Sequence, residues 1–248
     1  MIELQGLAKR YGAFEAVRDL TLRVEQGEVF GFLGPNGAGK TTTIRMMMGI
    51  LVPTQGRIEI AGFDAQAART DVNRRVGYLP DSPIFYDFLR AREILEFVGE
   101  MQGLTRADAR ARAATLLREF ALDEAAEEFA VNFSMGMKKK LGLACALIHD
   151  PPVLILDEPT NGLDPRAAHE VQERLRLAAA SGKTIFLSTH LLPMAEKLCS
   201  RIGIIHKGAL VESGTLDTLR SKVAVDASLE QLFLKLTEPD APEVNGAA

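Results

Sequence analysis

A glycine-rich octapeptide near the N-terminus has the residue types and spacing of a phosphate-binding loop. Residues 34–41 read Gly34-Pro35-Asn36-Gly37-Ala38-Gly39-Lys40-Thr41, which fits the pattern G-x-x-x-x-G-K-[ST]. Glycines allow main-chain conformations in which successive N–H groups face one anion, and a following helix adds its partial positive charge. The pattern predicts that Lys40 reaches the β- and γ-phosphates of a nucleotide, that Thr41 binds Mg²⁺ and that Thr42 is a further nucleotide contact.

Two carboxylates follow an apolar run in the second half of the chain. The run Val153–Leu156 is typical of a central parallel strand, and Asp157 and Glu158 stand at its carboxyl end. In a doubly wound sheet this end lies beside the phosphate-binding loop. We therefore expect Asp157 to hold Mg²⁺ through water, and Glu158 to orient or polarise water for attack on the γ-phosphate. The structural alternatives are a glycine-rich turn without a ligand and two acidic residues that open a loop before Pro159.

The sequence around these motifs indicates an α/β core interrupted by a helical insertion. Residues 29–33 form an apolar run that predicts a strand before the octapeptide. Residues 42–48, which follow the octapeptide, can form a helix. Further strands are predicted at 2–4, 16–24, 57–60, 76–79, 153–156, 184–187, 202–205 and 209–212. Apolar residues at helical spacing dominate from about 90 to 148, and a helix with Ala168, Val171, Leu175 and Ala178 facing inward follows the acidic pair.

Composition limits the classes of partner. The 248-residue chain has a formal net charge of −4, so nothing in its overall charge indicates binding to nucleic acid. No apolar stretch approaches the roughly 20 residues that a membrane-spanning helix needs. The N-terminal residues do not have the pattern of a signal peptide. We therefore expect any role at a membrane to depend on a partner protein.

Five motifs, in order, resemble those of the ABC ATPases over residues 2 to about 236. Besides the phosphate-binding loop, Asp157-Glu158-Pro159-Thr160-Asn161-Gly162-Leu163-Asp164-Pro165 resembles that family's Walker B motif and D-loop. Tyr11 matches the aromatic residue that stacks on adenine. Phe133-Ser134-Met135-Gly136-Met137 stands at the signature position, and Ser188-Thr189-His190 matches the segment with the switch histidine. Structural alternatives are a packed aromatic at Tyr11, an ordinary histidine at 190 and a helix cap at Ser134.

The resemblance implies a fold, a set of roles and a pairing of subunits. The implied fold is a P-loop nucleotide triphosphatase core with an N-terminal antiparallel β-subdomain and an inserted helical subdomain. The corresponding ranges are 1–236 for the ATPase domain, in which core and β-subdomain take 1–89 and 149–220 and the helical subdomain about 90–148, with a disordered tail at 237–248. Two subunits, identical or different, would pack head to tail around two ATP molecules. Ser134 and Gly136 would then contact the γ-phosphate held by the other subunit, Asp164 would lie at the interface, and Lys40, Glu158 and His190 would support hydrolysis.

Three positions depart from the common pattern of the family. Asp81 follows Gly77-Tyr78-Leu79-Pro80, where the family usually has a glutamine that contacts Mg²⁺ and the attacking water. A carboxylate can make these contacts but adds negative charge and lacks the amide donor. Met135 and Met137 replace a glycine and the glutamine of the signature. This combination, with the short helix expected at 228–236, resembles the branch that serves ABC-2-type exporters.

The expected function is that of an ATP-binding and ATP-hydrolysing subunit that powers export through a separate integral membrane permease. Its place would be the cytoplasmic face of the membrane. The aromatic-rich segment 83–89 is either part of the helical core or the groove where the family receives a short helix of the permease. One alternative is a soluble ABC-type ATPase without a permease, although the chain has a single P-loop and no heptad array. Another is a GTPase or small-molecule kinase, but the guanine-reading pattern Asn-Lys-x-Asp does not occur.

Overall fold

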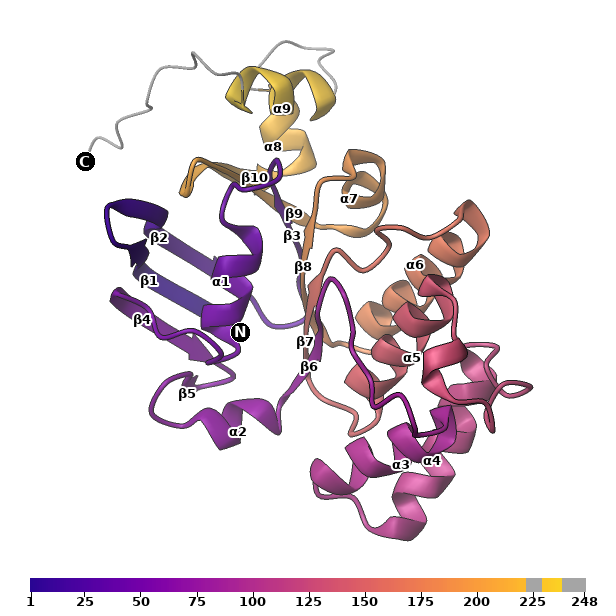
Figure 1. Cartoon of the computed structure of the whole chain (residues 1–248). Coiled ribbons are helices and arrows are strands. Elements are labelled where there is room, and N and C mark those ends of the chain that lie inside the picture. Colours follow the sequence, from indigo (N-terminus) through magenta and orange to yellow (C-terminus); the bar gives the residue numbers. More distant parts are fainter. Residues whose placement is uncertain (222–228, 238–248) are drawn as a thin grey trace.

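The computed structural model describes residues 1–221 and 229–237, and the strands of this part form two sheets (Figure 1). The smaller sheet has the order β2-β1-β4-β5, with antiparallel neighbours throughout. Its strands are β1 (Ile2–Tyr11), β2 (Phe14–Val24), β4 (Gln55–Ile60) and β5 (Phe63–Asp64). The first two form a long hairpin in which Tyr11 pairs with Phe14 at the tip.

The larger sheet has the order β10-β9-β3-β8-β7-β6. Its strands are β3 (Val29–Leu33), β6 (Val76–Leu79), β7 (Val153–Asp157), β8 (Thr184–Thr189), β9 (Arg201–His206) and β10 (Ala209–Thr215). All neighbours are parallel except β9 and β10, which form a hairpin. Every residue of β3, β7 and β8 is buried, as expected for central strands of a parallel sheet covered on both faces.

Helices α1 to α7 lie between these strands in the chain, and α8 and α9 follow the last strand. They are α1 (Lys40–Met47), α2 (Arg69–Asn73), α3 (Ala91–Met101), α4 (Arg106–Glu119), α5 (Met135–Leu147), α6 (Pro165–Ala180), α7 (Leu192–Leu198), α8 (Leu216–Ser221) and α9 (Leu229–Thr237), with a 3₁₀ turn at Ala130–Asn132. Between β6 and β7 the chain forms α3, α4 and α5, which pack together beside the larger sheet (Figure 1). No helix of the described part is long and apolar enough to cross a membrane.

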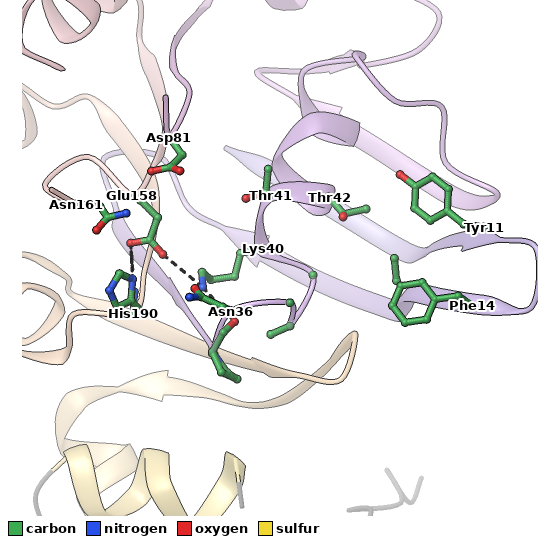
Figure 2. Close-up of a pocket in the computed structure, with 15 residues that line it drawn as sticks. Tyr11, Phe14, Asn36, Lys40, Thr41, Thr42, Asp81, Glu158, Asn161 and His190 are labelled. Atoms are coloured by element: carbon green, nitrogen blue, oxygen red, sulfur yellow. Dashed lines mark hydrogen bonds and ion pairs between the residues drawn. The ribbon is translucent and has the colours of Figure 1, made fainter. Parts of the chain in front are cut away.

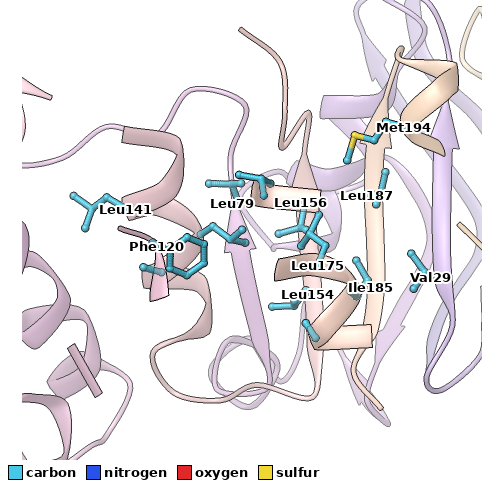
Figure 3. Packing of buried hydrophobic residues seen from close by; sticks show 14 of the residues in the cluster. Val29, Leu79, Phe120, Leu141, Leu154, Leu156, Leu175, Ile185, Leu187 and Met194 are labelled. Carbon is cyan, nitrogen blue, oxygen red and sulfur yellow. The ribbon is translucent and has the colours of Figure 1, made fainter. Parts of the chain in front are cut away.

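Alternation along the central strands produces two apolar cores, one on each face of the larger sheet. In β7, Leu154 and Leu156 belong to the core beneath α5 and α6, which Figure 3 shows. Val153 and Ile155 point the other way, into the core around α1 and the smaller sheet. Successive side chains of a strand face opposite sides, so one short apolar run contributes to both cores. The sheet edge that carries the polar residues at 157 and 158 is thereby held rigidly between two packed layers.

The expected fold is confirmed: a mixed α/β core carries an antiparallel sheet and an inserted set of helices. The strands at 29–33 and 76–79 have the predicted bounds. The first strand runs to Tyr11 instead of ending at Leu4, because its pairing with β2 continues to Tyr11 past three shifts in register and its pairing with β4 continues to Ala8 past one. The division into domains at about 90 and 148 stays a prediction.

Two local expectations are wrong. In α6 the buried alanine is Ala167, and Ala168 is only half-buried, because Ala167 lies one turn before the buried Val171 on the same helix face. At the other end of the chain, α9 includes Thr237, the first residue of the expected tail. The rest of that tail, 238–248, lies outside the described residues.

The contact between β6 and α5 predicts a strong effect at Gly77. A Cβ at this position would lie 2.0 Å from the main-chain oxygen of Ala146, so the strand and the helix would have to separate. We expect Gly77→Ala to lower the free energy of unfolding by about 2 kcal/mol, as overpacked sites commonly do. Urea denaturation measures the change. The control is Gly214→Ala in β10, where the new Cβ would meet its nearest neighbour at an ordinary 3.5 Å; equal midpoints for the two variants would contradict the packing argument.

Candidate functional site

The glycine-rich loop connects the end of β3 to the start of α1 and is held against two other strands. A Cβ at Gly34 would lie 2.4 Å from the main-chain oxygen of Ile205, and one at Gly39 would lie 2.7 Å from that of Ala16. Gly39 is also the residue that caps α1, with φ at 111°, a conformation that side chains rarely allow. Both glycines are therefore required by the fold, and they place the N-terminus of α1 at the edge of the sheet.

A cavity of about 530 Å³ lies over this loop (Figure 2). Its walls come from the loop and α1, the tip of the β1–β2 hairpin, and the segments after β6, β7 and β8. The lining residues are Tyr11, Phe14, Ala16, Pro35, Asn36, Gly37, Ala38, Gly39, Lys40, Thr41, Thr42, Asp81, Glu158, Asn161 and His190. The predicted residues Tyr11, 35–42, Asp81, Glu158 and His190 are thus brought together, although they come from distant parts of the sequence.

Lys40 stands at the centre of the site. Its Nζ donates to the main-chain oxygen of Gly34 at 2.6 Å and forms an ion pair with Oε1 of Glu158 at 3.3 Å. The lysine side chain is only 5% exposed, so these oxygens replace the water that an ammonium group would otherwise bind. A phosphate group that entered the cavity would carry negative charge, as Glu158 does, and could replace Glu158 as the anion that pairs with Lys40.

Glu158 connects Lys40 to His190. Its Oε2 lies 3.0 Å from Nδ1 of His190, and Figure 2 shows the carboxylate between the two basic side chains. Because a carboxylate oxygen accepts, Nδ1 of His190 is the donor in this contact. Glu158 adopts φ of 47°, an unusual value for a residue with a Cβ. This main-chain turn directs its side chain from the end of β7 into the cavity.

Asp157 is buried at the end of β7 and has an unsatisfied oxygen. Its Oδ1 accepts a hydrogen bond of 2.5 Å from Oγ of Ser188, and its Oδ2 is buried with no hydrogen-bond partner in the described structure. Burial raises the pKa of Asp157, while the hydrogen bond from Ser188 and the nearby hydroxyl of Thr41 oppose that rise. A buried carboxylate oxygen without a donor is what a cation would stabilise.

The donors around Asp157 fit Mg²⁺ better than a metal held by the protein alone. In the described residues there is no group of three or more His, Cys, Asp or Glu side chains arranged to hold a metal ion. Thr41 is a neighbour of Asp157, and Asp81 is near enough for its charge to raise the pKa of Asp157 further. Mg²⁺ is commonly bound by one or two carboxylates together with phosphate oxygens of a nucleotide. These residues could therefore hold Mg²⁺ once a nucleotide supplies the remaining ligands.

Two aromatic rings form the outer end of the cavity. Tyr11 and Phe14 are the paired residues at the tip of the β1–β2 hairpin, and their side chains remain 49% and 64% exposed. Exposed aromatic faces at a phosphate site are suited to stacking on a nucleotide base. Sequence analysis missed Phe14 as well as Asn161, which lines the cavity three positions after Glu158. The available signals were an aromatic residue three positions after Tyr11 and a polar residue inside the D-loop match.

Ser134, Gly136 and Asp164 do not line this cavity. Ser134 caps α5, where its Oγ accepts from the main-chain nitrogen of Met137 at 3.2 Å, and Asp164 caps α6 in the same manner. Both capping side chains are exposed. A Cβ at Gly136 would meet its nearest neighbour at 3.8 Å, so none of the residues that the structure describes requires a glycine there. These three residues instead face outward from the starts of two helices.

Comparison with known proteins identifies related chains. The model of the ABC transporter family matches residues 17–161, more than half of the chain. The Nod factor export ATP-binding protein I of Burkholderia pseudomallei (strain 1710b) is 43% identical over 239 residues, which cover 96% of this chain and 77% of that protein. A solved ATP-binding subunit of an ABC transporter superimposes with a TM-score of 0.89 at 38% identity, over 95% of this chain and 99% of that one.

A second solved structure shares the fold at lower identity. It is a dimeric ATP-binding cassette in a post-hydrolysis state with ADP and phosphate, and its TM-score is 0.79 at 22% identity. The superposition covers 87% of this chain and 98% of that chain.

The aromatic end of the cavity predicts a loss of ATP affinity in Tyr11→Ala. Stacking of a base on an aromatic ring contributes roughly 1–3 kcal/mol, so we expect ATP binding to weaken about tenfold. Titration calorimetry with a non-hydrolysable ATP analogue measures the affinity, and Phe14→Ala tests the second ring in the same way. Tyr86→Ala removes an equally exposed aromatic outside the cavity and is the control. Unchanged affinity in both Tyr11→Ala and Phe14→Ala would exclude base stacking at the hairpin tip.

Proposed function

This chain belongs to the ATPases of ABC transporters, and on that premise we propose that it powers export through a separate membrane permease by ATP-driven pairing of two subunits. The observation that carries the proposal is the position of Glu158, whose carboxylate lies between Lys40 and His190 at the mouth of the phosphate site. A group that can activate water, Glu158, then lies next to the lysine that would bind phosphate. The subunit would act at the cytoplasmic face of the membrane, where its permease holds it.

ATP binding would begin with an exchange of partners at Lys40. The β- and γ-phosphates would replace Glu158 as the anion next to its Nζ, and the main-chain N–H groups of the loop would receive the remaining phosphate oxygens. Thr41, Asp157 and Asp81 are the residues that would hold Mg²⁺ beside the phosphates, where the ion would offset their negative charge. The unsatisfied Oδ2 of Asp157 supports this assignment because it lacks any other partner in the described structure.

Hydrolysis would use the carboxylate that Lys40 has released. Glu158 would orient the attacking water and accept its proton, and His190 would donate from its ring to hold Glu158 in that position. Phosphoryl transfer depends mainly on positioning and on stabilising charge at the γ-phosphate. Lys40, Mg²⁺ and the helix N-terminus are the groups that would supply this charge.

The second subunit would complete the site through Ser134 and Gly136. Both lie at the start of α5, whose main-chain N–H groups and partial positive charge are suited to a γ-phosphate. A Cβ at Gly136 would make only ordinary contacts, the nearest at 3.8 Å, and this supports the role, since a glycine that the fold does not require permits close approach from outside. Asp164, at the start of α6, would lie at the same interface. A cassette of the same fold has been solved as a dimer.

The segment between β6 and α3 is suited to receive the permease. Ile84, Tyr86 and Phe88 are 92%, 58% and 74% exposed, which leaves three large apolar side chains on one short segment. Exposed apolar clusters of this kind mark surfaces that bind partners. The same loop carries Asp81 into the nucleotide cavity, so movement of the permease contact and changes at the γ-phosphate would be connected. Export is the direction named for the related Nod factor protein.

Glu158→Gln tests the assigned chemistry. The amide cannot accept the proton from water, so we expect ATP turnover to fall at least a hundredfold, a typical loss for a positioned general base. Binding of ATP should remain or improve because a negative charge near the phosphates is removed. Size-exclusion chromatography with ATP and Mg²⁺ should then show a stable dimer. Monomers that persist together with unchanged turnover would contradict both the role of Glu158 and the pairing of subunits.

Tyr86→Ser combined with Phe88→Ser tests the permease surface. We expect the variant to keep its own ATPase activity but to lose co-purification with a permease from solubilised membranes of the source cells, because the apolar contact area is removed. Leu177→Ser changes an equally exposed apolar residue on α6 and serves as the control. If no membrane protein co-purifies with the wild-type chain either, the chain acts as an ATPase without a permease.

A further inference from the structure

A buried lysine contacts two of the residues that line the nucleotide cavity, Glu158 and Asp81. Lys139 is on α5, and its side chain is 2% exposed. Its Nζ donates to the main-chain oxygen of Glu158 at 2.7 Å and lies 3.6 Å from Oδ1 of Asp81. Lysine is rarely buried to this degree without a specific partner, so the position of this ammonium group calls for an explanation.

The environment of Lys139 is costly for a positive charge and is offset by several carboxylates. Burial lowers the pKa of Lys139, because removal from water disfavours the charged form, while Asp81, Asp157 and Glu158 oppose that change. Lys139 is thus the basic group beside which the three acidic side chains gather. The negative charge that Asp81 adds, relative to a glutamine at this position, has its counterpart in this lysine.

Lys139 also holds the main chain of Glu158. That residue has φ of 47°, a conformation that the surrounding structure must maintain. On one side its N–H donates to Ser188, at 3.1 Å to Oγ and 3.2 Å to the main-chain oxygen. On the other side its carbonyl oxygen accepts from Lys139. The direction in which the Glu158 carboxylate points depends on both contacts.

The helix that carries Lys139 also carries the residues that face outward. Ser134 caps α5 five residues before Lys139, a separation of roughly 7.5 Å along the helix axis. A helix transmits displacement as a rigid unit over this length. Any shift of the Ser134 end therefore moves Nζ of Lys139 relative to Glu158 and Asp81.

We propose that Lys139 is a positioning residue for ATP hydrolysis, which aligns Glu158 and Asp81 with the helix that meets the nucleotide of the partner subunit. The inference rests on the proposed function, since it takes from it the roles of Glu158 and of the start of α5. When the partner's γ-phosphate seats against α5, Lys139 brings Glu158 into its working position. Without the partner's phosphate against α5, the carboxylate of Glu158 is positioned less well. Hydrolysis therefore depends on the pairing of the two subunits.

Lys139→Met provides the first test, with turnover and ATP affinity measured separately. We expect kcat to fall about tenfold or more, because small displacements of a catalytic group can cost up to about a hundredfold, while KM for ATP changes less than about twofold. Lys140→Met is the matched control: this lysine lies on the same helix and pairs with Glu170 at 2.5 Å, away from the cavity. Wild-type kcat in Lys139→Met, or an equal loss of kcat in Lys140→Met, overturns the proposal.

Asp81→Asn, alone and combined with Lys139→Met, tests the pairing of charges. Asp81 is partly exposed, so this change leaves the fold intact. Because Asp81 is also placed to hold Mg²⁺, we expect Asp81→Asn alone to lower activity. With the lysine absent, the same change also removes an unpaired carboxylate, so we expect the double variant to be at least about threefold more active than the product of the single effects. Effects that simply multiply overturn the pairing. If Lys139→Met does not fold, Lys139→Gln replaces it, with the same expected loss of kcat and retained ATP affinity.

Glu158→Gln, assayed in parallel, separates the two levels of inference. An inactive Glu158→Gln that forms ATP-dependent dimers, beside a fully active Lys139→Met, overturns the role of Lys139 alone. A Glu158→Gln variant with normal turnover overturns the proposed function itself, together with the inference that rests on it.

Discussion

The site depends on the parallel pairing of β3, β8 and β7. Leu33 pairs with Thr189, and Asp157 pairs with Ser188, so the three strands end at the same edge of the sheet. The phosphate-binding loop, the acidic pair and the histidine each follow directly from one of these ends. Strand pairing thus brings together residues from three distant parts of the chain, although no short stretch of sequence encodes a contact between them. Apolar cores on both faces of the sheet keep this edge rigid.

Charge balance is the second constraint. Asp81, Asp157 and Glu158 gather at the edge, and the two buried ammonium groups beside them are Lys40 and Lys139. Each lysine also donates to a main-chain oxygen, which replaces part of the lost hydration. Lys40 is placed to change partners when a phosphate enters, whereas Lys139 is buried among groups that belong to the protein. The two lysines thus have different roles on either side of Glu158: Lys40 would bind the ligand, and Lys139 would position Glu158.

The exposed N-terminal ends of α5 and α6 form a second surface, separate from the nucleotide cavity. Ser134 and Asp164 satisfy the first N–H groups of their own helices, and the same geometry leaves the ends of α5 and α6 exposed. Capping and anion binding need the same donors, so the proposed contact with a partner's nucleotide would require little rearrangement. An exposed Met135 beside Gly136 replaces the small residue of the common signature, and nothing in the fold of this chain requires a larger side chain there.

The sequence by itself determined the elements whose signals are local. The loop at 34–41 with its flanking strand, the strand that ends at Asp157 and the hairpin at 201–215 all depend on short-range spacing and periodicity. Only the tertiary structure decided the rest of the site. Phe14 becomes a lining residue because β1 and β2 pair up to Tyr11, which brings both rings to the tip of the hairpin beside the cavity.

Lys139 shows the difference most clearly. In the sequence it is the middle of three consecutive lysines, and no local pattern distinguishes it from its neighbours. Successive helix positions differ by about 100° around the axis, so the packing of α5 against the sheet buries one lysine beside Glu158 and pairs the next with Glu170. Which residue faces the site was decided by how two elements, distant along the chain, pack together.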